Sequence, residues 1–548
     1  MKSKLCIVLI VLALTGSVFG YSDVVETTKK RYIKPAPPFP AFTTAERHTE
    51  LAARRKKVAD SMEDNSVLVL FSAPAKIYTN DVDYHYRQEN NLYYLTALKQ
   101  NGVTLVILKI AGDVNELILL PKRNPQFETW NGRMYSNEDA TMLSGIRNIA
   151  DAKNRSTLIS AIRIGDDIGL DGVRVNGSGN VYLLTGNPRE FAFENELVKS
   201  IPERRLRNAS PIFARMRLVK SPYEIKILQH SIDITTEALM RSMGMVSKAN
   251  FEYEVQAELE FTFRRRNAEY WGFPSIVGCG PNATTLHYIE SQGGIRKDDL
   301  LLMDVGAEFD HYTADITRTF PVDGKFSKPQ KEIYQIVYDA QEAAARTLKP
   351  GSTFGRASSA ARNVIIDGLY ELGLITDKAS RMQVGLWFMH GWGHWLGMNV
   401  HDVGNYGTTL KEGMVMTNEP GIYVRENALD FLPDTAEWNE FKAKIRPAFE
   451  RYKGIGVRIE DDMLITKDGV EWMSKGLPRQ IEEVEKFMKG ARKEMRRYAL
   501  QRPSSKADIS NVLAVKYGDV SRDLAAAAGV TVKQGIGQNG KSVFFHSH

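Results

Sequence analysis

The chain has 548 residues, which is too long for one ordinary domain, so we expect two or three folded units. Hydrophobic residues make up 43% and charged residues 25%, a globular balance that excludes wholesale disorder. The net charge of +6 is spread thinly, without clustered basic and stacking residues, and this argues against nucleic acid as a partner. Two cysteines, Cys6 and Cys279, are too few for a disulfide-rich scaffold or a cysteine-based zinc cluster.

The first twenty residues have the layout of a secretory signal. Lys2 and Lys4 precede an apolar run, Leu5 to Leu14, and small residues follow up to Gly20. The run is shorter than the roughly 20 residues that a membrane-spanning helix needs, so an uncleaved anchor is the less favoured alternative. We therefore expect residues 1–20 to be a signal peptide and the protein to be secreted or periplasmic. No stable membrane anchor is expected after cleavage.

A smaller α/β domain is expected over residues 45–212. It follows residues 21–44, which are polar and then proline-rich, as is typical of an extended lead-in. A charged helix is expected at about Arg47–Met62. The strand candidates that follow it are Val67–Phe71, Val103–Lys109 and Glu116–Leu120.

A helix-start signal marks the beginning of the second domain. Ser221 supplies a capping hydroxyl, Pro222 fills the first helical position and Glu224 the third. A similar start at Ser327 and Pro329 predicts another helix further along. Amphipathic helices mixed with hairpin-like strands predict an α+β domain over residues 221–490. Residues 491–548 are a C-terminal extension, basic and helical at first, to which we assign no role.

Four carboxylates and one histidine of the second domain are candidate metal ligands. Most of them lie beside apolar, strand-like residues, where a charge is costly unless it is paired or bound to a cation. Mixed oxygen and nitrogen ligation suits Mn²⁺, Co²⁺ or Zn²⁺, and two such ions about 3.5–4 Å apart can share a hydroxide and polarise a carbonyl. The five residues are Asp304, Asp315, His394, Glu419 and Glu460.

Each of these residues taken alone also has a structural explanation. An isolated acid beside an apolar run more often ends a strand or forms a salt bridge, and a lone histidine in a glycine-rich loop is structural at least as often as functional. The spacings of 11, 79, 25 and 41 residues show nothing without a fold that gathers them. Strand alternation places Arg458 and Glu460 on one face, so Arg458 is a candidate to support a ligand or to reach substrate.

The surrounding motifs resemble those of the pita-bread metallopeptidases, the family of Xaa-Pro aminopeptidases, prolidases and methionine aminopeptidases. Four motifs occur in the same order as in the family. They are Asp304-Val305-Gly306 with Asp315, the segment from His390 to Gly404, the segment from Glu419 to Tyr423, and the segment from Arg458 to Asp462. The resemblance covers most of residues 45–490. It implies an α+β fold in which a smaller α/β domain precedes a C-terminal pita-bread catalytic domain.

The first domain carries a second resemblance. Tyr86–Thr96 and Trp130–Arg133 are similar to the N-terminal domain of aminopeptidase P. Methionine aminopeptidases lack this domain, so the resemblance points to the aminopeptidase P branch, close to prolidase.

The resemblance also implies roles for the candidate residues. The five ligands would bind two divalent ions per subunit, with Asp315 and Glu460 bridging, and Glu419 would carry the proton of the nucleophilic water. Manganese is the expected metal, with cobalt or zinc as alternatives. The residues implied to bind substrate and stabilise an oxyanion are His287, His390, His401 and Arg458.

The implied function is that of a secreted metalloaminopeptidase acting on peptides with a penultimate proline. A metal-bridging hydroxide would attack the bond between any N-terminal residue and that proline, and a homodimer or homotetramer is a further expectation. Two alternatives stay open: a prolidase restricted to dipeptides, and a non-catalytic binding protein on the same fold. Residues 426–449 look like an insertion near the site, which leaves the preferred peptide length open.

Overall fold

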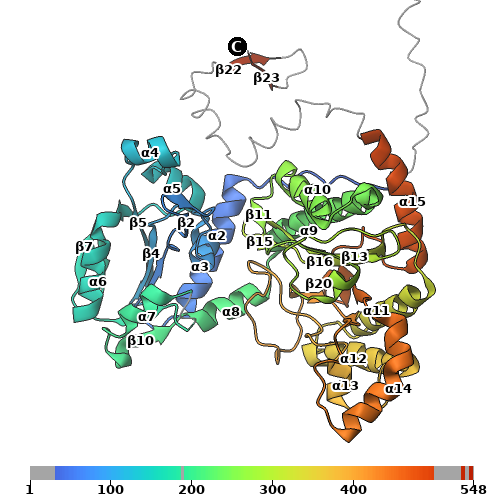
Figure 1. Cartoon of the computed structure of the whole chain (residues 1–548). Coiled ribbons are helices and arrows are strands. Elements are labelled where there is room, and N and C mark those ends of the chain that lie inside the picture. The colour runs from blue at the N-terminus through green and yellow to red at the C-terminus, as the bar shows by residue number, and fades with distance from the viewer. Residues whose placement is uncertain (1–30, 187–189, 499–531, 537–541, 547–548) are drawn as a thin grey trace, which may run out of the picture.

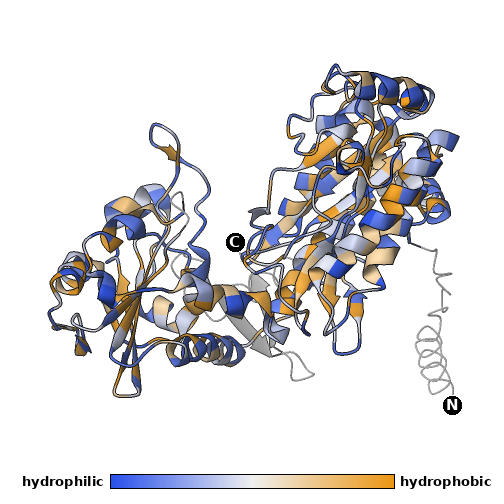
Figure 2. Cartoon of the chain, turned by 90° about the horizontal axis from the view of Figure 1, so that it is seen from below, coloured by the Kyte–Doolittle hydropathy of each residue, from blue (hydrophilic) through white to orange (hydrophobic). Residues whose placement is uncertain are grey.

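The computed structural model describes residues 31–186, 190–498, 532–536 and 542–546. The expected signal peptide and residues 21–30 of the lead-in lie outside the described residues. Figure 1 shows a smaller domain at the left and a larger one at the right, joined by α8 (Ser210–Leu218). In both domains hydrophobic residues are concentrated along the inner strands, as Figure 2 shows.

A six-stranded sheet forms the centre of the N-terminal domain, in the order β10-β9-β1-β4-β5-β6. Along β1, Val67 and Val69 join one apolar cluster whereas Leu68 and Leu70 join the other, because successive strand residues face opposite sides. Helices therefore cover both faces. The sheet strands are β1 (Ser66–Phe71), β4 (Thr104–Ile110), β5 (Asp113–Leu120), β6 (Ile149–Asp151), β9 (Asn180–Leu183) and β10 (Leu206–Asn208). The helices are α2 (Thr44–Asp60), α3 (Asn90–Thr96), α4 (Pro125–Asn131), α5 (Asn137–Ser144), α6 (Arg155–Ile164) and α7 (Ala192–Val198).

The expected strands of this domain are confirmed, with small shifts at their ends. The first helix begins three residues before the expected Arg47, because Thr43 and Glu46 form a capping box at its start. Two short hairpins complete the domain: β2 (Ile77–Thr79) with β3 (Val82–Asp83), and β7 (Ile168–Leu170) with β8 (Val173–Val175).

The C-terminal domain encloses short antiparallel sheets between helices. In Figure 1, α9 and α10 lie above the strands β13, β16 and β20, and α11 and α12 lie below them. The sheets have the orders β12-β13-β16, β11-β14-β15, β17-β20-β21 and β18-β19. The helices are α9 (Pro222–Met245), α10 (Glu252–Arg265), α11 (Lys328–Ala345), α12 (Phe354–Glu371), α13 (Arg381–Gly385), α14 (Ala436–Tyr452) and α15 (Ile481–Tyr498). The strands are β11 (Tyr270–Trp271), β12 (Ile276–Cys279), β13 (Leu300–Val305), β14 (Ala307–Phe309), β15 (Tyr312–Thr313), β16 (Ile316–Pro321), β17 (Val415–Asn418), β18 (Gly421–Tyr423), β19 (Gly456–Arg458), β20 (Asp461–Ile465) and β21 (Val470–Trp472).

The helix start expected at Ser221 is confirmed in its atomic detail. The backbone N–H of Glu224 donates to the Ser221 hydroxyl at 3.2 Å, and the Glu224 carboxylate accepts the N–H of Ser221 at 2.9 Å. The second expected start, at Ser327, also has a capping box and opens α11. In the C-terminal extension, β22 (Val532–Ile536) and β23 (Ser542–His546) pair antiparallel.

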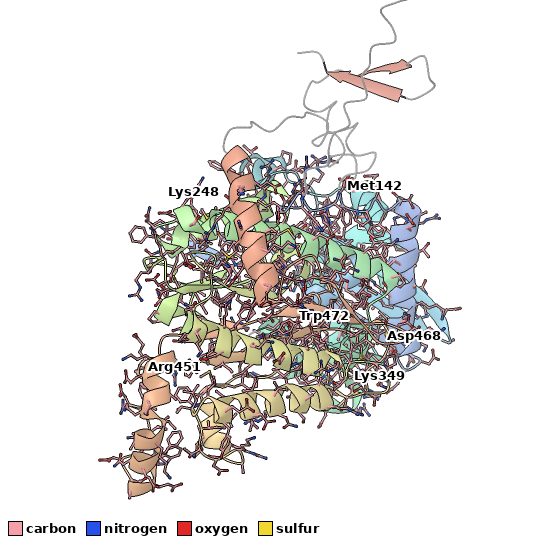
Figure 3. The ribbon with its side chains drawn as sticks, turned by 90° about the vertical axis from the view of Figure 1, so that its right-hand side faces the viewer. Met142, Lys248, Lys349, Arg451, Asp468 and Trp472 are labelled. Atoms are coloured by element: carbon pink, nitrogen blue, oxygen red, sulfur yellow. The ribbon has the colours of Figure 1, made fainter. Side chains whose placement is uncertain are left out.

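The lead-in is extended as expected where it is described, and it lies on the C-terminal domain. Backbone N–H groups of Tyr32 and Ala36 donate to Glu494 and Glu237, at 2.8 and 2.7 Å, and these acids belong to α15 and α9. Much of the suspected insertion at residues 426–449 forms α14. Arg451 on that helix, labelled in Figure 3, pairs with Glu332 of α11 at 2.6 Å, so α14 packs at the outer edge of the domain.

Candidate metal centre

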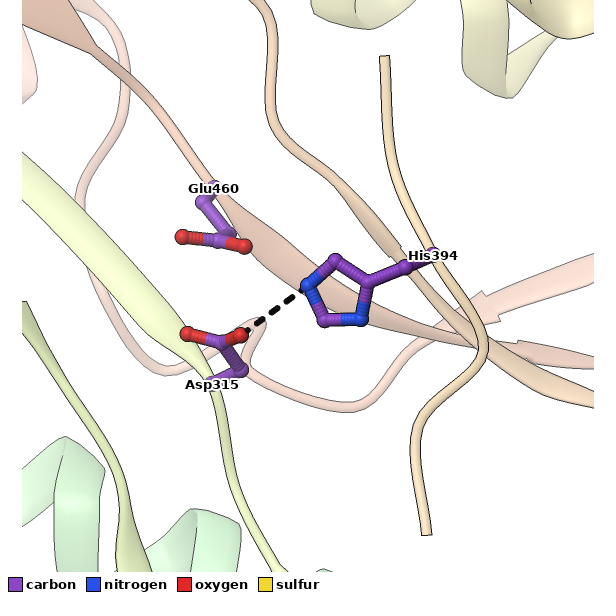
Figure 4. A group of neighbouring side chains, drawn as sticks. All are labelled: Asp315, His394 and Glu460. Atoms are coloured by element: carbon purple, nitrogen blue, oxygen red, sulfur yellow. Dashed lines mark ion pairs between the residues drawn. The ribbon is translucent and has the colours of Figure 1, made fainter. Parts of the chain in front are cut away.

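Three of the five candidate ligands form a compact group. Ligand atoms of Asp315, His394 and Glu460 all lie within 4.8 Å of one another, and all three side chains are buried (Figure 4). The His394 Nε2 atom is 3.2 Å from Asp315 Oδ2. Asp315 and Glu460, which are 145 positions apart in sequence, are thus brought close together.

Asp304 lies beside this group because of the pairing of two strands. In the register of β13 with β16, Asp304 is opposite Thr317, and Asp315 comes just before β16. The two acids are eleven positions apart in sequence, and the short strands β14 and β15 lie between them. The carboxyl of Asp304 nevertheless reaches that of Asp315, and its charge is one cause of the raised pKa of Asp315.

Glu419 meets His394 through β17. The backbone N–H of Thr417 donates to the His394 carbonyl at 2.9 Å, and the Thr417 hydroxyl donates to Glu419 Oε1 at 3.1 Å. This arrangement leaves Glu419 Oε1 3.3 Å from His394 Nε2. The other ring nitrogen, Nδ1, lies 3.2 Å from the carbonyl of Trp395. A proton on Nδ1 would bond there and leave Nε2 free as a ligand atom.

Glu460 lies at a break between two strands, which the sequence does not reveal. The expected single strand is divided into β19, which ends at Arg458, and β20, which begins at Asp461. The two side chains still lie close, with Arg458 Nε 4.0 Å from Glu460 Oε2. Thr317 joins them, since its hydroxyl donates to Glu460 at 2.6 Å and accepts from Arg458 Nε at 3.1 Å.

The electrostatics of the group favour a bound cation. Burial, followed by repulsion from neighbouring acids, raises the pKa of Asp315 and of Glu460 well above the ordinary carboxyl value. Burial likewise raises the pKa of Glu419. One buried atom, Asp304 Oδ1, has no hydrogen-bond partner. Crowded carboxylates beside one imidazole are the donors that divalent ions such as Mn²⁺ or Zn²⁺ bind, so these residues fit the implied metals.

The four residues expected to contact substrate surround this group at different depths. Arg458 is buried and donates to Asp304 Oδ2 at 2.5 Å and to the Tyr423 hydroxyl at 2.7 Å. His390 also bonds that hydroxyl, at 2.8 Å, and its Nδ1 lies 3.6 Å from Glu419 Oε2. Burial, then the charge of Arg458, lowers the pKa of His390 to about 3, so this imidazole is neutral.

The other two histidines lie nearer to solvent. The ring of His401 stands perpendicular to that of His394, with centroids 4.3 Å apart. Burial lowers the pKa of His401, and the neighbouring His394 and His287 lower it further. His287 itself is exposed. The structure therefore brings His390, His401 and Arg458 against the ligand group and leaves His287 at the rim.

Asp462 is a residue of the site to which the sequence analysis assigned no role. It is buried, its Oδ2 accepts the backbone N–H of Asp315 at 3.2 Å, and burial raises its pKa well above the ordinary value. Its Oδ1 has no hydrogen-bond partner. The sequence signal for this role is the pair of acids directly after Glu460. Burying two further carboxylates in a strand costs free energy unless they are hydrogen-bonded or bound to a cation.

A cavity of about 1300 Å³ lies between the two domains, and His401 is the candidate site residue that lines it. Its lining includes Arg47 and Tyr93 from the first domain, and Tyr270, Phe273 and His401 from the second. Among the described residues that line it, none belongs to the suspected insertion at 426–449. Both domains therefore shape the space beside the loop that carries His401.

Comparisons with known proteins agree with this architecture. Residues 226–467 match metallopeptidase family M24, and residues 51–166 match the aminopeptidase P N-terminal domain. The chain is 35% identical over 453 residues to Xaa-Pro aminopeptidase of Haemophilus influenzae, covering 80% of this chain and 97% of that relative. It is 33% identical over 473 residues to Xaa-Pro aminopeptidase of Escherichia coli, covering 81% and 98%. The structure of zinc-substituted E. coli aminopeptidase P in complex with product aligns with a TM-score of 0.71 at 30% identity, covering 83% of this chain and all of that one.

The fold and the site together define a metalloexopeptidase with a pita-bread catalytic domain. The chain belongs to metallopeptidase family M24 and has the N-terminal domain of the aminopeptidase P branch. The resemblance and the α+β fold expected from the sequence are confirmed. An enzyme is the function class, and the hypothesis of a non-catalytic binding protein is set aside.

Proposed function

We propose that the chain hydrolyses the bond between the N-terminal residue of a peptide and a penultimate proline. The observation that carries this proposal is the group of buried acids around His394, next to His401, which lines a cavity shared with an aminopeptidase P-type domain. The names of the relatives, Xaa-Pro aminopeptidases, support the same substrate class. General peptidases act poorly on such bonds because the imide has no N–H and proline fixes the shape of the chain.

Two divalent ions per subunit are part of this proposal. We assign their ligands as Asp304, Asp315, His394, Glu419 and Glu460, and manganese as the metal, with cobalt or zinc as alternatives. When bound, the ions supply the Lewis-acid chemistry that yields a hydroxide nucleophile and polarises the scissile carbonyl.

Side chains of this protein would accept the proton, stabilise the oxyanion and contact the substrate. Glu419 is the proposed proton acceptor, because burial raises the pKa of its carboxyl and so makes the carboxylate a stronger base. Arg458 supplies a positive charge beside the ligand group that would stabilise an oxyanion. Neutral His390, whose Nδ1 proton is taken by the Gly391 carbonyl at 2.7 Å, would contact the substrate. His401 and His287 lie between the ligand group and solvent, where they would contact the substrate around the proline.

The size of the cavity favours an aminopeptidase over a prolidase. Its volume of about 1300 Å³ exceeds the 300–1,000 Å³ typical of small-molecule sites, and a dipeptide would leave most of it empty. An open space beyond His401 accommodates residues after the proline, whereas a dipeptidase needs a site that closes on a terminal carboxylate.

The peptide-length preference can be measured directly. We expect the Mn²⁺-loaded enzyme to release alanine from Ala-Pro-Ala and from a longer Ala-Pro peptide with kcat/KM about tenfold or more above that for Ala-Pro, since the cavity adds binding energy only for the longer chains. Replacing the proline of each peptide by alanine serves as the control for specificity. Cleavage of Ala-Pro alone would instead identify a prolidase.

Export and self-association also stay proposals. We propose secretion or transfer to a periplasm on the basis of residues 1–20, followed by cleavage of that segment. Within the described ranges, no helix is long and apolar enough to cross a membrane. Assembly as a homodimer or homotetramer is proposed from the family resemblance.

A further inference from the structure

The loop that carries His401 depends on side chains from outside its own domain. Residues 397–404 contain no helix or strand. Their backbone has few ties to the rest of the domain: the Gly397 carbonyl accepts from Thr313 N–H at 3.0 Å, and Asp402 N–H donates to the Trp395 carbonyl at 2.9 Å. A loop with so few backbone bonds needs other anchors to hold a histidine in one place.

Arg87 of the N-terminal domain supplies one anchor. Its Nη2 donates to the Met398 carbonyl at 2.6 Å, and its Nε donates to both carboxylate oxygens of Glu308, at 3.0 and 2.8 Å. Its Nη1 donates to Asn90 Oδ1 at 2.8 Å, and Asn90 in turn bonds Asn399 at 2.8 Å. One guanidinium thus links the loop, strand β14 and helix α3.

A buried ion pair holds the other end of the loop. Asp402, next to His401, accepts from Arg217 Nη2 at 2.5 Å and lies 3.7 Å from Lys220 Nζ. Arg217 on α8 also donates to Asn91 Oδ1 at 2.9 Å, which brings α3 into the same network. Both members of the pair are almost wholly buried, with side chains 3% and 1% exposed, so their geometry is tightly held.

The same segment of the N-terminal domain also holds the hairpin that leads to Asp315. Asp310 and His311, between β14 and β15, both have left-handed backbones, with φ of 51° and 68°. Such a backbone is unfavourable for a residue with a side chain and needs contacts that hold it. Tyr93 supplies such contacts, because its ring stacks on His311 with centroids 3.8 Å apart and its hydroxyl bonds Asp310. Strand β15 then runs directly into the segment that carries Asp315.

We propose that residues 87–93 of the N-terminal domain position the active site, and that Arg87 is the positioning residue that holds the His401 loop against the β14–β15 hairpin. Arg87 contacts none of the five ligands. It lines the cavity, but its guanidinium nitrogens bond the loop, β14 and α3, so its effect on the site is exerted through the loop. The expected loss of turnover in an Arg87 variant rests on the proposed function. The expected loosening of the His401 loop does not.

The test compares Arg87→Met with Arg207→Met in the full-length, Mn²⁺-loaded protein. Arg207 is a matched control, since it pairs with Glu63 through two bonds of 2.7 and 3.0 Å and is 33% exposed against 35% for Arg87, but it bonds only within its own domain. Hydrogen exchange of the peptides that cover residues 397–404 and 310–315 should become about tenfold faster in Arg87→Met and stay unchanged in Arg207→Met.

Kinetics supply the second readout. On an Ala-Pro peptide, Arg87→Met should lower kcat about tenfold with two ions still bound, Arg87→Lys should recover part of the loss, and Arg207→Met should match the wild type. Unchanged exchange in the loop would overturn the inference, and so would faster exchange with wild-type kcat. If the wild type itself fails on all Xaa-Pro peptides, the proposed function fails, while the exchange result still decides whether Arg87 holds the loop.

Discussion

Replacing Glu419 by glutamine is expected to lower kcat on an Ala-Pro peptide by about 10³-fold. Glutamine has nearly the same shape, but it neither accepts the proton of the attacking water nor supplies an anionic ligand. The partners of the carboxylate, Thr417 at 3.1 Å and His394 at 3.3 Å, can also bond an amide, so the fold should be retained. The measurement is steady-state hydrolysis at saturating Mn²⁺, with circular dichroism to verify folding.

Glu412→Gln is the matched control for this variant. Glu412 is an exposed glutamate seven positions away, and its replacement should leave kcat unchanged. Activity of Glu419→Gln close to that of the wild type would remove Glu419 from the mechanism.

Replacing Asp315 by asparagine is expected to change stability in opposite directions with and without metal. In chelated protein at pH 8 the variant should be more stable by about 1–2 kcal/mol, because removing one charge relieves repulsion in a buried acidic group. With metal at about 100 times its Kd the wild type gains about 2.7 kcal/mol, and the variant, which lacks a proposed bridging ligand, should gain much less. Thermal unfolding with chelator and with Mn²⁺ measures both effects.

The pH dependence of the chelated form follows from the raised pKa of Asp315. The folded protein holds the proton of this carboxyl more tightly than the unfolded chain does. Ionisation of Asp315 therefore lowers the stability of the fold fully only at a pH above the pKa in the folded protein. Below the pKa in the unfolded chain, this loss of stability disappears. The advantage of Asp315→Asn should therefore shrink as the pH falls from 8 to 5. Asp468→Asn, in the exposed turn before β21 (Figure 3), is the control and should change thermal stability neither with chelator nor with Mn²⁺. Equal metal stabilisation of Asp315→Asn and the wild type would contradict the ligand assignment.

The parts of the fold that depend on local sequence were predictable. The start of α9 needs only Ser221, Pro222 and Glu224, and the position of β1 follows from an apolar run. The candidate ligands, in contrast, were recognised through motifs rather than through spacing. Residues up to 156 positions apart meet only because β13, β16, β17 and β20 pair as they do.

Long-range features of the site were not predictable from the sequence. The break between β19 and β20 changes the surroundings of Glu460, although its residues have the composition of a continuous strand. The bond from Asp462 to the backbone of Asp315, and that from Arg87 to Met398, join segments more than 140 positions apart. Such bonds depend on tertiary geometry, which residue type and local periodicity do not specify.

We propose that the five ligands hold two ions on which peptide hydrolysis depends. The most direct test is to titrate chelated enzyme with Mn²⁺ while release of alanine from Ala-Pro-Ala and the bound metal are measured in the same samples. We predict no turnover in the metal-free protein and full activity at two ions per chain. Full activity without metal, or none with two ions bound, would contradict this account of the site.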